Sequence, residues 1–231
     1  VDKLRAAAEQ AGARFITGAR VTRVEHDSAV RAVHLADGAR VPVAAAIVAV
    51  SPAEASALVN DPALQTWAQA AVPVKAACLD VALERLPEPR ALFALGMDRP
   101  LYYSVHSATA RLAPADAALI HVALYLGNET TDTHAVEHEL EGALDLLQPG
   151  WRTILRERRF LPSITVANAM VTAAQGGYAG RPKVDSVGGR GLFLAGDWVG
   201  DEGMLADASV ASGARAADLI LQRHVLQAMA A

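Results

Sequence analysis

The chain has 231 residues, of which 52% are hydrophobic and 20% are charged, and its formal net charge is −4. This composition is typical of a globular protein with a sizeable core and excludes a largely disordered chain. The charge gives no electrostatic reason to expect nucleic acid or an anionic membrane as a partner. The single cysteine, Cys78, excludes an intramolecular disulfide and a zinc site built on several thiolates, and we expect no metal site.

Cys78 lies in an apolar run, which predicts a buried, unreactive thiol. The longest apolar stretches, residues 44–50 and 117–126, have the length of strands and fall short of the roughly 18 residues that a membrane-spanning helix needs. The chain shows no signal peptide. We therefore expect a cytoplasmic protein without a transmembrane segment.

The first residues follow a helical pattern. Val1, Leu4, Ala8 and Ala11 share one face, and Gly12 is a natural end for the helix. No cap or strand precedes this helix, which indicates that an upstream segment has been removed. A chain that simply begins here is the alternative.

A series of strands comes next. They are expected at residues 13–17, 21–25, 30–35 and 40–43. Asp37 and Gly38 predict a tight hairpin between the last two. The continuous apolar run at residues 47–50 predicts a strand buried on both faces, and it ends at Ser51, which is the expected N-cap of a helix beginning at Pro52.

The middle of the chain is expected to contain two helices and five strands. Helices are expected at residues 62–71 and 133–147, and strands at 74–84, 91–95, 101–106, 118–126 and 154–160. Strands grouped around one long helix indicate a mixed or antiparallel sheet. The glycine-rich segment 173–191 is expected to be a loop.

Near the end, a buried strand at residues 192–195 runs into Gly196 and Asp197. A helix is expected from about residue 205 to 222, with Val210 on its inward face and small residues that permit close packing. A helix start offers free backbone N–H groups to an electron-rich ligand, and a carboxylate after a strand can accept hydrogen bonds from sugar or ribityl hydroxyls. The alternative is that Asp197 caps a loop and Gly203 turns the chain.

Residues 191–200 and 203–213 together resemble the C-terminal flavin motif of the FAD-dependent amine oxidase and phytoene desaturase superfamily. The resemblance implies that Asp197 binds the ribityl chain of FAD and that the backbone of Met204, Leu205 and Ala206 contacts the isoalloxazine ring. Gly196 and Gly203 belong to the same motif.

Earlier segments resemble the superfamily too. Residues 4–8 and 18–24 are similar to its segment in which the backbone of a valine, here Val21, pairs with the adenine edge of FAD. Residues 47–52 resemble the return to its Rossmann-type sheet, which adds Ser51 to the implied cofactor-binding residues. The glycine-rich phosphate-binding turn G-x-G-x-x-G of such domains is absent from this chain.

The resemblance implies an α/β fold: part of a Rossmann-type FAD-binding domain, formed by residues 1–52 and 186–231, and an inserted α+β substrate-binding domain, residues 53–185, with a mixed or antiparallel sheet as one wall of the active site. No cysteine is placed for covalent flavin attachment, and no catalytic lysine or other catalytic residue can be identified.

We therefore expect the C-terminal portion of an FAD-dependent, phytoene dehydrogenase-like oxidoreductase that acts on a small or isoprenoid-like organic substrate. One alternative is a flavin-free binding module of the same fold. Another is one half of a split flavoenzyme, completed by a partner chain that supplies the G-x-G-x-x-G segment. A homo-oligomer is also compatible with the sequence.

Overall fold

The computed structural model describes residues 1–127 and 132–229, with side chains described up to Arg223. The chain divides into two compact units. Unit 1 comprises Val1–Ala71 and Val171–Ala231, and unit 2 comprises Val72–Met170. Within the described ranges, no helix is both long and apolar enough to cross a membrane.

The unit boundaries differ from residues 52/53 and 185/186, where the sequence placed the domain boundaries. The difference arises because two helices, α2 (Pro52–Val59) and α3 (Pro62–Ala70), pack within unit 1. The ring of His26 is hydrogen-bonded to the carbonyl of Val59, and the indole N–H of Trp67 donates to the carbonyl of Gly180 at 2.8 Å. The assignment of the two units to cofactor and substrate stays a prediction.

Unit 1 begins with α1 (Asp2–Gln10), which buries none of its residues. The predicted strand at residues 13–17 is wrong: Phe15 and Ile16 are exposed, and no strand pairs with this segment in the part of the chain that the structure describes. Without a partner strand to accept its backbone hydrogen bonds, an extended segment of five residues does not form a ladder.

A three-stranded antiparallel sheet follows, made of β1 (Val21–His26), β2 (Val30–Leu35) and β3 (Arg40–Pro42). The predicted hairpin joins β2 to β3, where the carboxylate of Asp37 accepts from the amide of Ala39 at 2.9 Å. On the surface of this sheet, Glu25 accepts two hydrogen bonds from Arg40, both 2.9 Å long, and one from His34. The contacts with Arg40 and then His34 lower the pKa of Glu25 to about 2.

The second sheet of unit 1 is a parallel pair, β4 (Ala46–Val48) and β10 (Leu192–Leu194). All three residues of β10 are buried, but Ile47 of β4 is 41% exposed. The expectation that this apolar run is buried on both faces is therefore wrong, because β4 has β10 as its one strand neighbour among the described residues.

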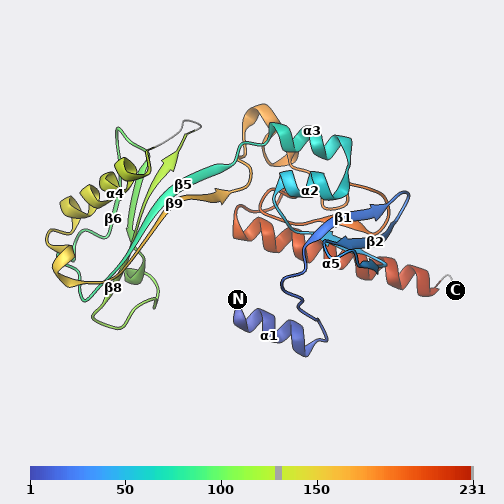
Figure 1. Ribbon diagram of the computed structural model, residues 1–231, viewed down its shortest axis with the longest axis horizontal. Helices are drawn as coiled ribbons and strands as arrows, with labels where there is room; N and C mark the ends of the chain where they lie inside the picture. The colour runs from blue at the N-terminus through green and yellow to red at the C-terminus, as the bar shows by residue number, and fades with distance from the viewer. Residues whose placement is uncertain (128–131, 230–231) are drawn as a thin grey trace. The chain divides into compact units, whose positions relative to one another are not determined.

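The long helix α5 (Ala206–Met229) completes unit 1 (Figure 1). Its buried face is formed by Ala208, Ser212 and Ala216, whereas Val210, which we expected to face inward, is 71% exposed. The small side chains let the helix approach the strand end at Gly196 closely, as the sequence predicted. The helix ends seven residues later than expected, since no helix-breaking residue follows Gln222.

Unit 2 contains one five-stranded antiparallel sheet in the order β6-β7-β8-β5-β9. Its strands are β5 (Val74–Leu83), β6 (Phe93–Leu95), β7 (Leu101–Val105), β8 (Ala118–Leu126) and β9 (Leu155–Ala167). The sequence predicted a mixed or antiparallel sheet, and the antiparallel sheet is confirmed. Pro162, which cannot donate to a ladder, lies on β9 at an edge of the sheet, where it is tolerated.

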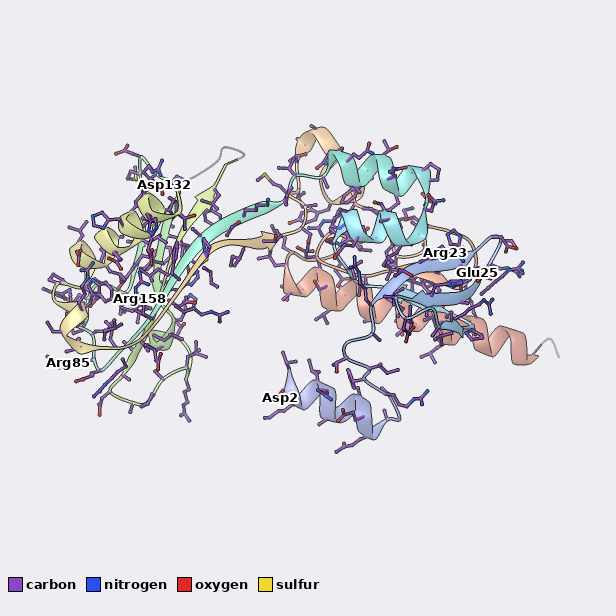
Figure 2. The ribbon with its side chains drawn as sticks, viewed as in Figure 1. Asp2, Arg23, Glu25, Arg85, Asp132 and Arg158 are labelled. Atoms are coloured by element: carbon purple, nitrogen blue, oxygen red, sulfur yellow. The ribbon has the colours of Figure 1, made fainter. Side chains whose placement is uncertain are left out.

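Helix α4 (Thr133–Leu147), at the predicted bounds, covers one face of this sheet and encloses the main core (Figure 1). Leu79, Ile120 and Leu140 are representative of this fully buried layer. At the rim, Arg158 of β9 (labelled in Figure 2) forms ion pairs with Glu137 and Glu141 of α4 at 2.5 and 2.7 Å. These contacts fix the helix on one side and leave the other face of the sheet without a covering helix from this unit.

Candidate functional site

The parallel pair β4–β10 brings two of the predicted cofactor segments together. Val48 pairs with Leu194 in register, and the amide of Ala195 donates to the carbonyl of Val48 at 3.1 Å. Both strands therefore end at the same edge, with Ser51 following β4 and Gly196 and Asp197 following β10. Ligands of open α/β sheets bind outside this carboxyl edge.

Ser51 closes the first of these segments as a helix cap. Its hydroxyl accepts from the amide of Glu54, and the carboxylate of Glu54 accepts from the hydroxyl of Ser51 at 2.7 Å and from its amide at 3.3 Å. The predicted N-cap is confirmed, and such a cap stabilises a helix by about 1 kcal/mol. These hydrogen bonds lower the pKa of Glu54 and orient the chain at the edge of the sheet.

Gly196 lies in close contact with α5. The hydroxyl of Ser212 accepts from the amide of Gly196 at 3.0 Å and also lies 3.2 Å from its carbonyl oxygen. A Cβ atom at Gly196 would lie 2.8 Å from Nε1 of Trp198, closer than such contacts occur. Any larger residue would push the strand end away from the indole, which explains the glycine before Asp197.

Trp198 is fully buried. Its indole N–H donates to the carbonyl of Val50 at 3.0 Å, and its ring stacks on Trp67 with centroids 5.5 Å apart. The side chain thus connects the segment after β10 with the segment before Ser51. Asp197, immediately before it, is half-buried.

The loop before α5 has an unusual backbone. Leu205 has φ +52°, a left-handed conformation that is strained for a branched side chain, and Gly203 has φ +70°. A Cβ at Gly203 would lie 2.9 Å from the Cβ of Asp207, so the turn also requires glycine for space. Strained residues of this kind cluster at ligand sites, where the surroundings enforce them.

This turn leaves Met204 and Leu205 exposed directly before the first helical residue, Ala206. The first N–H groups of a helix have no partner within it and carry the positive end of the helix dipole. The three predicted ring-contacting residues are therefore accessible at the start of a 24-residue helix. The arrangement fits an electron-rich ring edge of FAD at this position.

Arg181 is a site neighbour whose role sequence reasoning missed. It is 8% exposed, its Nη1 donates to the carbonyl of Gly203 at 3.0 Å, and its guanidinium lies over the ring of Tyr178. The amide of Gly200 donates to the carbonyl of Pro182 at 2.8 Å. Arg181 and Pro182 thus hold both ends of the loop from Gly200 to Gly203. The sequence contained this Gly-Arg-Pro segment, but no periodicity links it to residue 203.

The remaining predicted residue, Val21, stands apart. It is the first residue of β1, in the three-stranded sheet, and pairs with Leu35. The structure thus gathers Ser51, Gly196 and Asp197 at one sheet edge, with the second turn of α5 joined to it through Ser212. Val21 belongs to a different sheet of the same unit.

The chain was compared with known protein families, sequences and solved structures. The family described as flavin containing amine oxidoreductase matches residues 1–74, and no curated protein sequence matches the chain. Among solved structures, an oxidoreductase from Methanosarcina mazei is 17% identical with a TM-score of 0.67, covering 90% of this chain and 50% of that one. Reduced UDP-galactopyranose mutase is 12% identical with a TM-score of 0.72, covering 94% and 50%.

Putrescine oxidase with bound putrescine is 16% identical with a TM-score of 0.64, covering 93% of this chain and 51% of that one. The chain spans about half the length of these solved proteins, and at such identities the likeness concerns the fold. The predicted resemblance to FAD-dependent oxidoreductases is confirmed: the chain has a mixed α/β fold shared with oxidoreductases, and its first 74 residues match a flavin-containing oxidoreductase family.

Proposed function

We propose that the chain is the C-terminal portion of an FAD-dependent oxidoreductase and that unit 1 holds the cofactor at the carboxyl edge of β4 and β10. The observation that carries the proposal is the meeting of Ser51, Gly196 and Asp197 at this edge, next to the small side chains of α5, whose second turn contacts Gly196 through Ser212. The family matched by residues 1–74 supports the choice of a flavin.

Each residue has a physical role in this proposal. The carboxylate of Asp197 accepts hydrogen bonds from the ribityl hydroxyls, and the N–H groups of residues 204–206 point their dipole at the ring. The backbone of Val21 pairs with the adenine. When bound, FAD would supply the redox chemistry by accepting a hydride equivalent from a C–H bond of the substrate, with a proton lost from the neighbouring atom. The chain's own residues orient the cofactor.

The form Gly-Asp-Trp-Val-Gly at residues 196–200 favours a phytoene dehydrogenase-like enzyme that dehydrogenates a small or isoprenoid-like organic substrate. We assign cofactor binding to unit 1 and substrate binding to unit 2. A cytoplasmic location and a partner segment that supplies the G-x-G-x-x-G phosphate contacts complete the proposal.

Replacing Asp197 by alanine in the intact natural protein tests this assignment. We expect the dissociation constant for FAD to rise roughly 10- to 100-fold, because a hydrogen bond to a charged group contributes about 1.5 to 3 kcal/mol. Titration of FAD fluorescence measures the change. Asp201→Ala is the matched control, since Asp201 is an exposed acid of the same loop. Equal affinities of the two variants would remove Asp197 from the cofactor site.

A further inference from the structure

A cavity of about 180 Å³ lies in unit 1, between helix α3 (Figure 1) and the segment of residues 180–187. All of its lining residues belong to this one unit. The indole N–H of Trp67 donates to the carbonyl of Gly180 and so holds the helix to the segment. An engineered protein cavity of about 150 Å³ binds benzene, so this one has room for a small molecule.

One part of the lining is apolar. It is formed by Leu64 and Trp67 of α3 together with Pro182 and Val187, and we call these four side chains the apolar wall. Leu64 and Val187 are buried, and the ring of Trp67 is held in place by its stacking on Trp198. A preformed apolar wall with a few polar groups is typical of small-molecule sites.

Arg181 supplies a cation to the lining. Its side chain is 8% exposed, and a guanidinium stays protonated in proteins. Nη1 donates to the carbonyl of Gly203, whereas Nε is buried without a hydrogen-bond partner. Among the residues that the structure describes, no carboxylate forms an ion pair with Arg181. A buried charge without a counter-ion is costly, so the free N–H groups of this guanidinium suit an anionic group of a ligand.

Asp61 supplies the opposite charge. It is the N-cap of α3, and its Oδ1 accepts from the amide of Leu64 at 2.9 Å. A carboxylate has about four acceptor positions, so most of its capacity remains after this hydrogen bond. Asp61 and Arg181 are the charged residues of the lining, all of which the structure describes, and no ion pair joins them. The cavity therefore offers one anion and one cation that are not paired with each other.

These two charges discriminate between classes of ligand. A carboxylate alone is attracted by Arg181 but repelled by Asp61, and an amine alone meets the reverse. A molecule that carries both charges is attracted by both residues. The lining thus matches a small zwitterion with an apolar body.

We propose that this cavity binds a free α-amino acid with an apolar side chain of about the size of leucine. Its carboxylate accepts charge-assisted hydrogen bonds from Arg181, its ammonium donates to Asp61, and its side chain lies on the apolar wall. Arg181 keeps its hydrogen bond to Gly203 in this arrangement. The site goes beyond the proposed cofactor edge and uses different side chains.

Leucine and two singly charged analogues are matched probes for this proposal. Isocaproate is leucine without its amino group, and isoamylammonium is leucine without its carboxylate. Each is titrated into the intact natural protein at neutral pH, without added flavin, by isothermal titration calorimetry. We expect saturable binding of leucine, at least about tenfold tighter than that of either analogue, because each analogue lacks one charge-assisted contact.

Substitutions separate the roles of the two charged residues. Asp61→Asn removes the charge but keeps the helix cap, since asparagine caps helices as well as aspartate does. We expect it to weaken leucine about tenfold or more and to leave isocaproate no weaker than in the wild type. Arg181→Gln is expected to weaken leucine and isocaproate alike. Asp185→Asn is the matched control, because Asp185 is exposed and outside the lining, and it leaves both affinities unchanged.

No saturable binding of leucine, or equal affinities for leucine and either analogue, would overturn the proposal. Unchanged leucine affinity in Asp61→Asn would do the same. Circular dichroism shows whether each variant is folded, and Asp61→Asn tests the site even where Arg181→Gln is unfolded. Because the titrations need no flavin, leucine binding in a protein that fails to retain FAD would leave this site standing and count against the proposed cofactor edge. FAD retention without leucine binding would do the reverse.

Discussion

Replacing Trp198 by alanine will destabilise unit 1 by about 3 to 5 kcal/mol, the range measured for buried tryptophan truncations. The side chain is 0% exposed, stacks on Trp67 and donates its N–H to the carbonyl of Val50. Its loss removes the packing that joins the ends of β4 and β10 and leaves that carbonyl without its donor. Because whole domains are stable by only about 5 to 15 kcal/mol, the change is a large fraction of the total.

Hydrogen exchange measured by mass spectrometry reports this loss locally. We expect faster exchange of the β10 amides in the variant, with the β5 amides of unit 2 as an internal control. Trp198→Phe keeps a stacking ring but loses the hydrogen bond and part of the indole volume, so its effect should be smaller than that of alanine, about 1 to 3 kcal/mol. Unchanged β10 exchange in Trp198→Ala would show that the indole does not brace the predicted cofactor edge.

Replacing Gln148 by leucine will destabilise unit 2 by about 3 kcal/mol. Gln148 is fully buried at the end of α4, and its amide nitrogen lies 3.1 Å from the carbonyl of Glu88, 3.0 Å from that of Ala91 and 2.9 Å from the hydroxyl of Tyr103. Its side-chain oxygen accepts from the amide of Glu88 at 2.9 Å. Leucine fills similar space but leaves the amide of Glu88 without its acceptor, at about 1 to 3 kcal/mol, and removes three further hydrogen bonds from groups that keep one other partner, since Ala91 still accepts from Tyr103 and Glu88 from the amide of Ala91.

Urea denaturation followed by circular dichroism measures the effect of Gln148→Leu. Tyr103→Phe removes one member of the same network and should cost less, about 1 kcal/mol. The double variant should be less destabilised than the sum of the single ones, since both act on shared hydrogen bonds. A strictly additive double variant, or a neutral Gln148→Leu, would mean that the network does not stabilise the end of α4.

Local patterns in the sequence identified most elements of both units. Strand-like apolar runs predicted β5 and β8, and the capping residues predicted the helix that begins after Ser51. The strand at residues 13–17 failed because strand formation depends on a partner that local pattern does not reveal. The inward face of α5 was predicted by apolar content, whereas close packing against Gly196 selected the smaller Ala208 and Ser212 instead.

In the candidate sites too, local motifs were predictable from the sequence, whereas contacts between distant residues were not. The Gly-Asp motif at residues 196 and 197 was recognisable, but the bracing of Gly203 by Arg181 joins residues 22 positions apart. The cavity lined by Asp61 and Arg181 forms where Trp67 meets Gly180, 113 positions away. The one hint in the sequence was the expected helix at residues 62–71, and no pattern indicated which segment would lie beside it.

The absorbance spectrum of the intact natural protein, recorded after FAD is added and unbound cofactor is removed by desalting, tests the central claim most directly. Our account predicts that the visible bands of oxidised flavin remain with the protein and are greatly reduced in Asp197→Ala, while Asp201→Ala retains them. A wild-type protein that emerges folded and colourless would contradict the account and favour a flavin-free binding module of the same fold.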